Sequence, residues 1–271
     1  MKLLKKYYYP PVNFWSVWFS EIVIRSLKKN GYKVNESDTV LDVGCGLGNH
    51  CFSMLAYDPK SVTGFDISKE TIELLRTFSD KIDFRKVDIC LDDITQYRSK
   101  FSVVFSCDVY EHVDDPQVML NNLFYVLKDN GVVSVTFPNF DNHGHNQIKN
   151  INELSDKLNL AGFKDHKIDV IKDRTLIYKL YTGFYIILQN LSDKMYGIER
   201  NKINRMPESD EFHEMYAYKK INKIKNKRIL IFIINFAYNV LKKLGRLTAV
   251  YVTERNPESI RDKRIVFWAV K

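Results

Sequence analysis

Alternation of short apolar strands with amphipathic helices is the feature that most restricts how this chain can fold. Strand-like segments end repeatedly at a glycine or an acidic residue, as in Thr39–Val43 before Gly44 and in Ser61–Asp66. Strands that alternate with helices imply a parallel sheet covered on both faces, so we predict an α/β, doubly wound fold. The pattern predicts strands at 39–43, 61–66, 82–87, 101–106, 132–137, 163–171 and 264–270, and helices at 14–30, 50–57, 68–78, 116–128 and 151–160.

The alternation is interrupted by residues 172–262, and the charge of the chain divides at the same place. The chain has 271 residues and a net charge of +8, and this block alone holds 18 Lys or Arg and 10 Asp or Glu. The remaining residues hold 23 of each sign, which argues against a uniformly basic nucleic-acid-binding protein. A block of this length is too long for a plain loop. We predict an N-terminal helical cover at 1–34, a core at 35–171 and 263–271, and a basic, mainly helical substrate cap at 172–262.

Cysteine usage and hydropathy restrict the compartment. None of the four cysteines forms a CxxC pair, and their spacing suggests neither a disulfide framework nor a zinc site. No apolar run reaches the length of a membrane-spanning helix, and the N-terminus lacks the apolar stretch and cleavage site of a signal peptide. We therefore expect a cytoplasmic protein.

Three glycines follow the first predicted strand, and aspartates end the next two. Gly44, Gly46 and Gly48 let the backbone turn sharply and approach a ligand closely. The dinucleotide fingerprint G-x-G-x-x-G would need a further glycine where Asn49 stands, which argues against a pyrophosphate cofactor. An acid at Asp66 can accept hydrogen bonds from ribose hydroxyls, and Asp88 is placed to meet the base of the same nucleoside.

These residues resemble the motifs of the class I S-adenosylmethionine-dependent methyltransferases. VLDVGCGLG at 40–48 looks like the first motif, GFDIS at 64–68 like the ribose motif, and VDI at 87–89 like the adenine motif. FSVVFSCDVYEHVDDP at 101–116 and LKDNGVVSVTFPN at 127–139 are similar to the segments that follow. The resemblance implies a Rossmann-like sheet of seven strands with an antiparallel last strand, and S-adenosylmethionine as cofactor.

The resemblance also implies roles for single residues. The three glycines would pass under the methionine part of the cofactor, and Asp42 would hold its amino group, directly or through water. Asp66 would hold the ribose, and Asp88 would face the adenine. The predicted cofactor-binding residues are Asp42, Gly44, Gly46, Gly48, Asp66, Ile67, Asp88, Ile89, Ser106 and Cys107.

The cofactor brings an activated methyl group, so the protein mainly has to position the acceptor and remove its proton. Candidate bases should lie on the loops after the fourth and fifth strands. His145 and His143 follow the fifth strand and titrate near neutrality, and Tyr110 follows the fourth. We predict no metal centre, although a Glu-His neighbourhood such as Glu111–His112 is associated with a divalent ion in some quinone O-methyltransferases, which stays an alternative.

The basic block favours an acceptor with negative charge, phosphate above all. Tyr8 and Tyr9 are candidates for an aromatic cover over the site, because a sulfonium or ammonium group favours aromatic faces. The predicted anion-binding residues are Arg174, Arg200, Arg205 and Lys219. We therefore predict methyl transfer to a nitrogen or oxygen of a small, phosphate-bearing molecule such as a phosphoethanolamine-like amine or a sugar-phosphate-type hydroxyl.

Two alternatives stay open. The apolar run Ile229–Leu241 is too short to span a bilayer but has lysines on both sides, so it could lie in an anionic membrane surface instead of packing in the cap. In that case the enzyme would act at the membrane on a quinone or a lipid-linked sugar. The other alternative is an RNA-binding or RNA-modifying protein on the same fold, although nucleic acid is not the partner that we expect.

Overall fold

The computed structural model describes residues 15–46, 48–76, 79–139, 148–173, 183, 249–252, 260 and 263–271. Within these ranges the helices and strands alternate as the sequence predicts. The strands are β1 (Thr39–Val43), β2 (Ser61–Asp66), β3 (Ile82–Lys86), β4 (Phe101–Cys107), β5 (Leu127–Asn139), β6 (Asp165–Asp173), β7 (Ala249–Val252) and β8 (Lys263–Val270). The helices are α1 (Trp15–Lys29), α2 (Asn49–Met54), α3 (Lys69–Arg76), α4 (Pro116–Val126) and α5 (Ile151–Ala161), with 3-10 turns η2 (Leu55–Tyr57) and η3 (Thr95–Tyr97).

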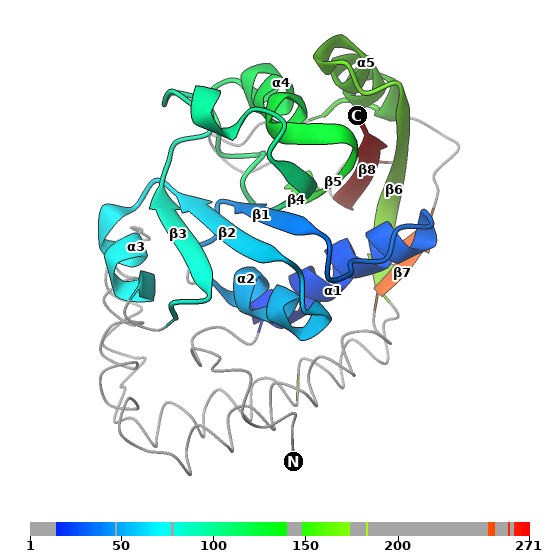
Figure 1. Ribbon diagram of the computed structural model, residues 1–271. Coiled ribbons are helices and arrows are strands. Elements are labelled where there is room, and N and C mark those ends of the chain that lie inside the picture. The colour runs from blue at the N-terminus through cyan, green and yellow to red at the C-terminus, as the bar shows by residue number, and fades with distance from the viewer. Residues whose placement is uncertain are drawn as a thin grey trace, which may run out of the picture.

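The strands form one mixed sheet in the order β3-β2-β1-β4-β5-β8-β6-β7 (Figure 1). Strands β1 to β5 are parallel, and the strand order reverses at β1, which pairs with β2 on one side and β4 on the other. The last strand, β8, lies antiparallel between β5 and β6. The predicted doubly wound sheet with an antiparallel last strand is thus confirmed.

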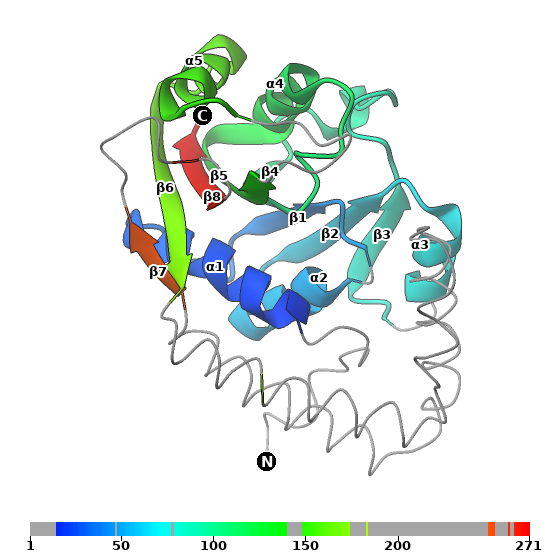
Figure 2. The ribbon, with the colours of Figure 1, turned by 180° about the vertical axis from the view of Figure 1, so that it is seen from behind.

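Helices cover both faces of the sheet, as both views of the ribbon show (Figures 1 and 2). On one face, apolar residues of α1, α2 and α3 such as Ile22, Phe52 and Leu75 form one buried cluster with the strands. On the other face, apolar residues of α4 and α5 such as Leu120 and Leu158 form a second cluster. The central strands β1, β4 and β5 are almost entirely buried between the two clusters, which explains their nearly continuous apolar sequences.

Side chains at the helix ends account for several boundaries. Asp115 accepts hydrogen bonds from the backbone N–H groups of the first turn of α4, and Pro116 occupies the first helical position. Gly162 ends α5 with φ of 106°, a conformation that favours glycine. Helix α4 is shorter than predicted, because Leu127 already pairs with Phe101 of β4 as the start of β5.

The boundary between the core and the predicted cap needs a correction. Strand β6 continues to Asp173, two residues into the block predicted as a cap, and a strand from inside that block, β7, adds an eighth strand at the edge of the sheet. The pattern missed β7 because its four residues, AVYV, are too few to show a period. The predicted helical character of 174–248 concerns residues that, apart from Gly183, lie outside the described ones.

We call the edge where β1 to β5 end the carboxyl edge of the sheet. Ligands of doubly wound sheets bind at this edge, next to the point where the strand order reverses. Because β6 runs parallel to β5, Asp173 also lies toward this edge, and Ala249, which pairs with Asp173, begins β7 there. The first residues of β8, Lys263 and Arg264, reach the same edge opposite Asn139 and Pro138.

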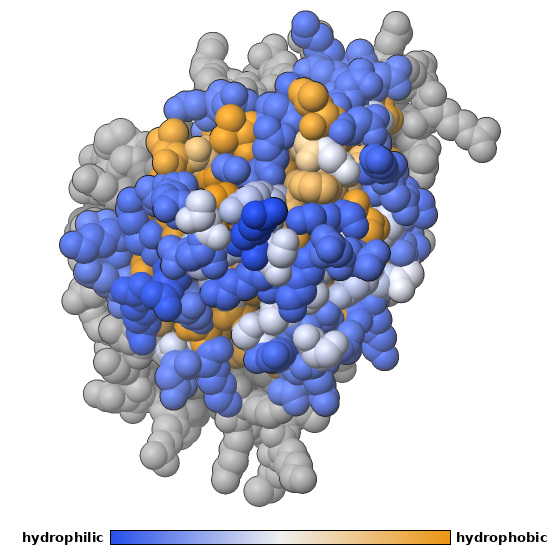
Figure 3. Space-filling view, turned by 45° about the horizontal axis from the view of Figure 1, so that its top comes forward, coloured by the Kyte–Doolittle hydropathy of each residue, from blue (hydrophilic) through white to orange (hydrophobic). Residues whose placement is uncertain are grey.

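The described surface carries few large apolar side chains. On the face shown in Figure 3, hydrophilic residues predominate and apolar residues form small patches among them. Within the described part of the chain, no helix has the length and hydropathy that a crossing of a membrane requires.

Candidate functional site

A glycine loop connects β1 to α2 at the carboxyl edge. Gly44, Gly46 and Gly48 all have positive φ, of 72°, 47° and 74°. The N–H groups of Gly44 and Cys45 both donate to the carbonyl of Phe65 in β2, at 2.9 and 2.8 Å, which holds the loop against the neighbouring strand. These hydrogen bonds fix the backbone of the loop at the end of β1, where its glycines contribute no side chain of their own.

Gly44 has a second reason to be glycine. A Cβ atom at this position would lie 2.1 Å from Cγ2 of Val109, which belongs to the turn after β4. The glycine loop and the turn after β4 are therefore in direct contact. This contact joins the predicted cofactor side of the site to the predicted acceptor side.

Asp42 lies beneath the glycine loop with no exposed surface. Its Oδ2 accepts a hydrogen bond from the Cys51 thiol at 3.2 Å, while Oδ1 has no hydrogen-bond partner among the described residues. Burial, with a smaller contribution from the nearby charge of Asp66, raises the pKa of the Asp42 carboxyl to about 8. A buried carboxyl oxygen without a partner suits a ligand that brings an N–H donor and a positive charge.

Asp66 ends β2 and holds the loops on both sides of it. Its Oδ2 accepts the N–H of Gly46 at 2.8 Å, and its Oδ1 accepts the N–H of Ser68 at 3.0 Å. Two backbone donors fix the carboxylate at the carboxyl edge, next to the glycine loop. A carboxylate fixed in this way can still accept hydrogen bonds from two adjacent hydroxyls, because each oxygen has two lone pairs.

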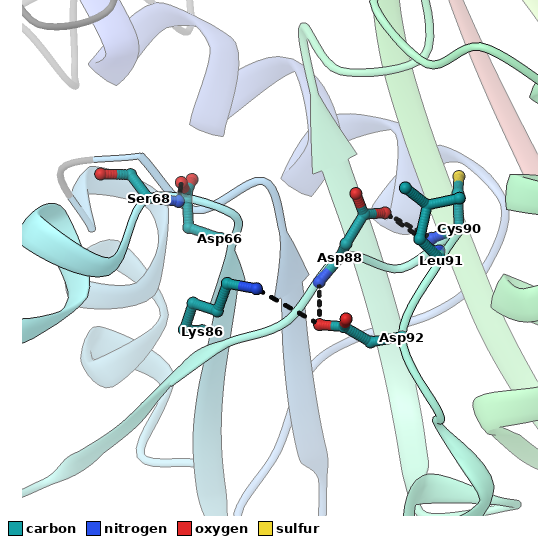
Figure 4. Close-up of polar contacts among 7 residues, drawn as sticks. All are labelled: Asp66, Ser68, Lys86, Asp88, Cys90, Leu91 and Asp92. Carbon is teal, nitrogen blue, oxygen red and sulfur yellow. Dashed lines mark hydrogen bonds and ion pairs between the residues drawn. The ribbon is translucent and has the colours of Figure 1, made fainter.

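Asp88 follows β3 and organises the next turn (Figure 4). Its Oδ1 accepts the N–H groups of Cys90 and Leu91 at 2.8 and 3.2 Å, and its own N–H donates to Oδ2 of Asp92 at 2.9 Å. Figure 4 shows Asp66 and Asp88 at the ends of neighbouring strands. The structure therefore brings the predicted ribose residue and the predicted adenine residue to the same edge.

Two exposed apolar side chains stand beside these aspartates. Ile67 is 64% exposed and Leu91 is 79% exposed, whereas Ile89 is buried. An exposed large apolar side chain is informative when it lies next to polar groups that converge, since ligand sites combine apolar walls with a few polar contacts. Ile67 and Leu91 are suited to contact the faces of a planar base.

Ser106 and Cys107 end β4 and are buried. The Ser106 hydroxyl donates to the carbonyl of Val43 at 2.8 Å, which ties β4 to β1 just before the glycine loop. Burial raises the pKa of the Cys107 thiol, and the neighbouring charge of Asp42 raises it further, so this thiol stays protonated. Both residues thus lie where the prediction needs them, in positions that also serve packing.

Tyr110, a predicted catalytic candidate, has no exposed surface and stacks on Phe137 with ring centroids 4.4 Å apart. Burial raises the pKa of its hydroxyl, which has no hydrogen-bond partner among the described residues. This surrounding favours a packing role. The other predicted catalytic and substrate residues lie outside the described ones: His143, His145, Tyr8, Tyr9, Arg174, Arg200, Arg205, Lys219 and the run 229–241.

Two features of the turn after β4 could not be predicted from the sequence. Glu111 is buried in the turn after β4, and Arg264 of β8 forms a bidentate ion pair with Asp108 of the same turn. The YEHV segment shows that an acidic residue stands at position 111, but the sequence does not show that this residue is buried. The pairing of residues 156 positions apart left no signal in the sequence. In the described part of the chain, no group of three or more His, Cys, Asp or Glu is arranged to hold a metal ion.

The site fits an S-adenosyl ligand. The glycine loop leaves room for a ligand backbone, Asp42 offers a buried oxygen for an amino group, and Asp66 with Asp88 offers carboxylates for a nucleoside. Residues 34–220 match the protein family described as a methyltransferase domain. The chain belongs to this family. It is a class I S-adenosylmethionine-dependent methyltransferase, and S-adenosylmethionine is its cofactor.

Curated relatives of this methyltransferase act on different acceptors. The ubiquinone biosynthesis O-methyltransferase of Rickettsia typhi is 26% identical over 208 residues, which are 76% of this chain and 82% of that protein. The tRNA U34 carboxymethyltransferase of Campylobacter concisus is 38% identical over 96 residues, or 34% of this chain. The chain spans only about a third of the length of that tRNA enzyme, 32%.

Solved structures confirm the fold. Phosphoethanolamine N-methyltransferase 2 of Haemonchus contortus, in complex with phosphomonomethylethanolamine and S-adenosylhomocysteine, has a TM-score of 0.52 at 16% identity. That match covers 94% of this chain and 52% of the other. The YcgJ protein of Bacillus subtilis also has a TM-score of 0.52, at 13% identity, and covers 93% of this chain and 98% of its own.

Proposed function

We propose that this methyltransferase transfers a methyl group to a nitrogen or oxygen of a small acceptor that carries negative charge, phosphate above all. The proposal depends on one observation, namely that the basic segment connects two strands, β6 and β7, at the carboxyl edge of the sheet. Asp173 of β6 pairs with Ala249 of β7, so the chain between them leaves from the carboxyl edge and returns to it. This is also the edge where Asp42, Asp66 and Asp88 lie.

The charge of that segment supports an anionic acceptor. Residues 174–248 hold 15 Lys or Arg and 6 Asp or Glu, a net charge of +9, although the whole chain carries only +8. Arg and Lys side chains bind phosphate through charge-assisted hydrogen bonds, and a concentration of one charge sign near a site raises the local concentration of substrate of the opposite sign. The proposed phosphate ligands are Arg174, Arg200, Arg205 and Lys219, with Tyr8 and Tyr9 as the aromatic cover.

A membrane-surface O-methyltransferase of a quinone or a lipid-linked sugar is the second candidate. The ubiquinone biosynthesis relative favours it, because that likeness extends over 76% of this chain. The lysine-flanked run Ile229–Leu241 would then bind anionic lipid. The phosphorylated amine in the Haemonchus structure belongs to the acceptor class of the first candidate, but at 16% identity that likeness supports the fold alone.

A radiolabelled-methyl assay separates the candidates. The panel would contain phosphoethanolamine, sugar phosphates, a nucleotide sugar, a quinol, a lipid-linked sugar and tRNA, each with the full chain. We expect methylation of a phosphorylated small molecule, with a KM that rises several-fold with added salt because screening weakens the attraction of the acceptor. Methylation of the quinol or the lipid-linked sugar alone, together with sedimentation on anionic vesicles, would establish the second candidate. Methylation of tRNA alone would contradict both.

Matched variants test the role of the basic segment. Arg174→Gln and Lys219→Gln are expected to raise the KM of the acceptor while the affinity for S-adenosylhomocysteine stays unchanged. Lys33→Gln and Lys81→Gln remove the same charge from exposed positions of the core and serve as controls. If all four variants behave alike, the basic segment has no special part in binding the acceptor.

A further inference from the structure

Glu111 is a buried carboxyl whose place in the structure is not explained by packing. The residue has no exposed surface, and neither Oε1 nor Oε2 has a hydrogen-bond partner among the described residues. Leaving both oxygens of a buried carboxyl without a donor is costly, and natural folds retain such groups mainly at functional sites. Burial, with a smaller contribution from the charge of Asp108, raises the pKa of Glu111 to about 8.

The turn that carries Glu111 belongs to the functional site. It follows β4, the strand beside β1, and its Val109 side chain occupies the space that a Cβ of Gly44 would need. Cys107, the last residue of β4, directly precedes this turn, and the charges of both Asp42 and Glu111 raise the pKa of its thiol. Glu111 is thus close to the glycine loop on the side of β4, away from the nucleoside residues of β2 and β3.

An ion pair holds this turn in place. Both oxygens of Asp108 accept hydrogen bonds from the guanidinium of Arg264, whose Nη2 lies 3.4 Å from Asp108 Oδ2. Asp108 adopts φ of 56°, which turns the chain sharply at the end of β4. The pair therefore ties the turn to the start of β8, on the far side of β5. Of two neighbouring acids, Asp108 forms the ion pair with Arg264, whereas the carboxyl of Glu111 lies 3.8 Å from Nε2 of His112 and accepts no hydrogen bond from a described residue.

We infer that Glu111 is the catalytic residue that accepts the proton of the acceptor's hydroxyl or amine, and that Asp108 and Arg264 are a positioning pair for it. This inference rests on the proposed function, because it needs an acceptor with a removable proton. As the acceptor atom forms its bond to the methyl carbon, the carbon–sulfur bond breaks with its electron pair left on sulfur, and the acceptor proton goes to a Glu111 carboxylate oxygen. His112, with Nε2 3.8 Å from Glu111 Oε1 and a side chain 57% exposed, is placed to pass that proton to solvent.

The catalytic test compares Glu111→Gln with Glu73→Gln, an exposed acid of α3, on whichever acceptor the methyl assay identifies. We expect kcat of Glu111→Gln to fall about a hundredfold or more, the typical contribution of a general base. Affinity for S-adenosylhomocysteine should change less than twofold, and the rise of kcat with pH that we expect for the parent protein should be absent in the variant. An unchanged kcat would overturn the inference and leave the proposed function standing.

The pH dependence of kcat distinguishes a positioning role of Asp108 and Arg264 from a merely structural one. The charge of Asp108 raises the pKa of Glu111 and the charge of Arg264 lowers it. Asp108→Asn should therefore move the rise of kcat to lower pH, and Arg264→Gln should move it to higher pH. Equal losses of kcat without opposite shifts would contradict the positioning role. Loss of activity with EDTA and its return with Mg²⁺ would make Glu111 a metal ligand, which also overturns the inference.

A stability measurement judges Glu111 even if the acceptor panel fails. The carboxyl is ionised in the unfolded chain above its ordinary pKa of 4.5 but keeps its proton in the folded chain up to about pH 8. Between pH 4.5 and about pH 8 the folded chain therefore binds one proton more than the unfolded chain. The free energy of unfolding falls as the pH rises through this range. We expect the melting temperature of the parent protein to fall relative to that of Glu111→Gln between pH 5 and pH 9. Parallel melting curves would show that Glu111 is not a buried, unpartnered carboxyl. Glu111→Met, which also lacks a titrating carboxyl, serves if the glutamine variant does not fold.

Discussion

Cofactor binding should be coupled to the release of a proton from Asp42. The carboxyl is fully buried, its Oδ1 has no partner among the described residues, and its pKa is raised to about 8. At neutral pH the empty protein therefore holds this carboxyl mostly protonated. If Asp42 binds the cationic amino group of S-adenosylhomocysteine, binding favours the ionised form and expels the proton.

The size of the effect follows from linkage. Between pH 6 and pH 7 the ionised fraction of a group with a pKa of about 8 rises about tenfold per pH unit, while an α-amino group with a pKa of about 7.7–8.0 stays mostly protonated. The association constant should therefore rise about tenfold over this interval, which corresponds to about 1.4 kcal/mol. Asp42→Asn cannot ionise, so its affinity should be weaker at pH 7 and nearly independent of pH.

Titration calorimetry with S-adenosylhomocysteine at pH 6.0, 6.5 and 7.0 measures this directly. Repeating it in buffers with different ionisation enthalpies counts the protons released, and we expect about one per ligand for the parent protein and none for Asp42→Asn. Asp83→Asn, which changes a half-exposed acid of β3, is the matched control and should keep the full pH dependence. An affinity that does not vary with pH, without proton release, would mean that the amino group is bound away from Asp42.

Three further outcomes are expected. Asp66→Ala should weaken S-adenosylhomocysteine binding at least tenfold in calorimetry, about 1.4 kcal/mol, because it removes the ribose acceptor and the bond that holds the Gly46 N–H; unchanged binding would refute that role. Gly44→Ala should lower the free energy of unfolding in urea by about 1–3 kcal/mol, because its Cβ would overlap Val109, whereas Gly31→Ala, with nothing within 4 Å, should cost less. Equal losses would show that φ alone matters. Chelation by EDTA should leave methyl transfer unchanged, because Glu111 is expected to take a proton and not to hold a metal ion.

The sequence predicts the cofactor side of the molecule well because its signals are local. The strand ends carry polar residues next to apolar runs, so Asp66 and Asp88 could be placed from spacing, whereas Asp42 was indicated by the resemblance to the first motif. Because parallel strands end at the same edge of the sheet, residues at the ends of three such strands are expected to lie close together even when no long-range contact is known. The same reasoning could not detect Leu91, since exposure of an apolar side chain depends on what packs over it.

The acceptor side could not be predicted in the same way, because its contacts join distant segments. Arg264 meets Asp108 only because β8 enters the sheet next to β5. Strand β7 has four residues within a basic block, so its pairing with β6 is set by the sheet and not by its own periodicity. A histidine or tyrosine near a strand end, such as Tyr110, attracts attention in a sequence even when the fold buries it against Phe137.

The division between local and distant contacts also bears on how this enzyme selects its acceptor. The nucleoside end of the site consists of residues at the ends of β1, β2 and β3, all of which lie before or at residue 88 in the sequence. The proposed acceptor end consists of the turn after β4 and the start of β8, and the basic segment lies in the sequence between β6 and β7. If that segment contacts the acceptor, as proposed, a change in it would alter acceptor binding while the hydrogen bonds of the glycine loop to Phe65 and Asp66 remain in place. Arg264 connects these two parts of the chain. A change in the length or packing of the segment before β8 would move Arg264 and so weaken its ion pair with Asp108. The loss of that ion pair would in turn change the position and pKa of Glu111, the proposed proton acceptor.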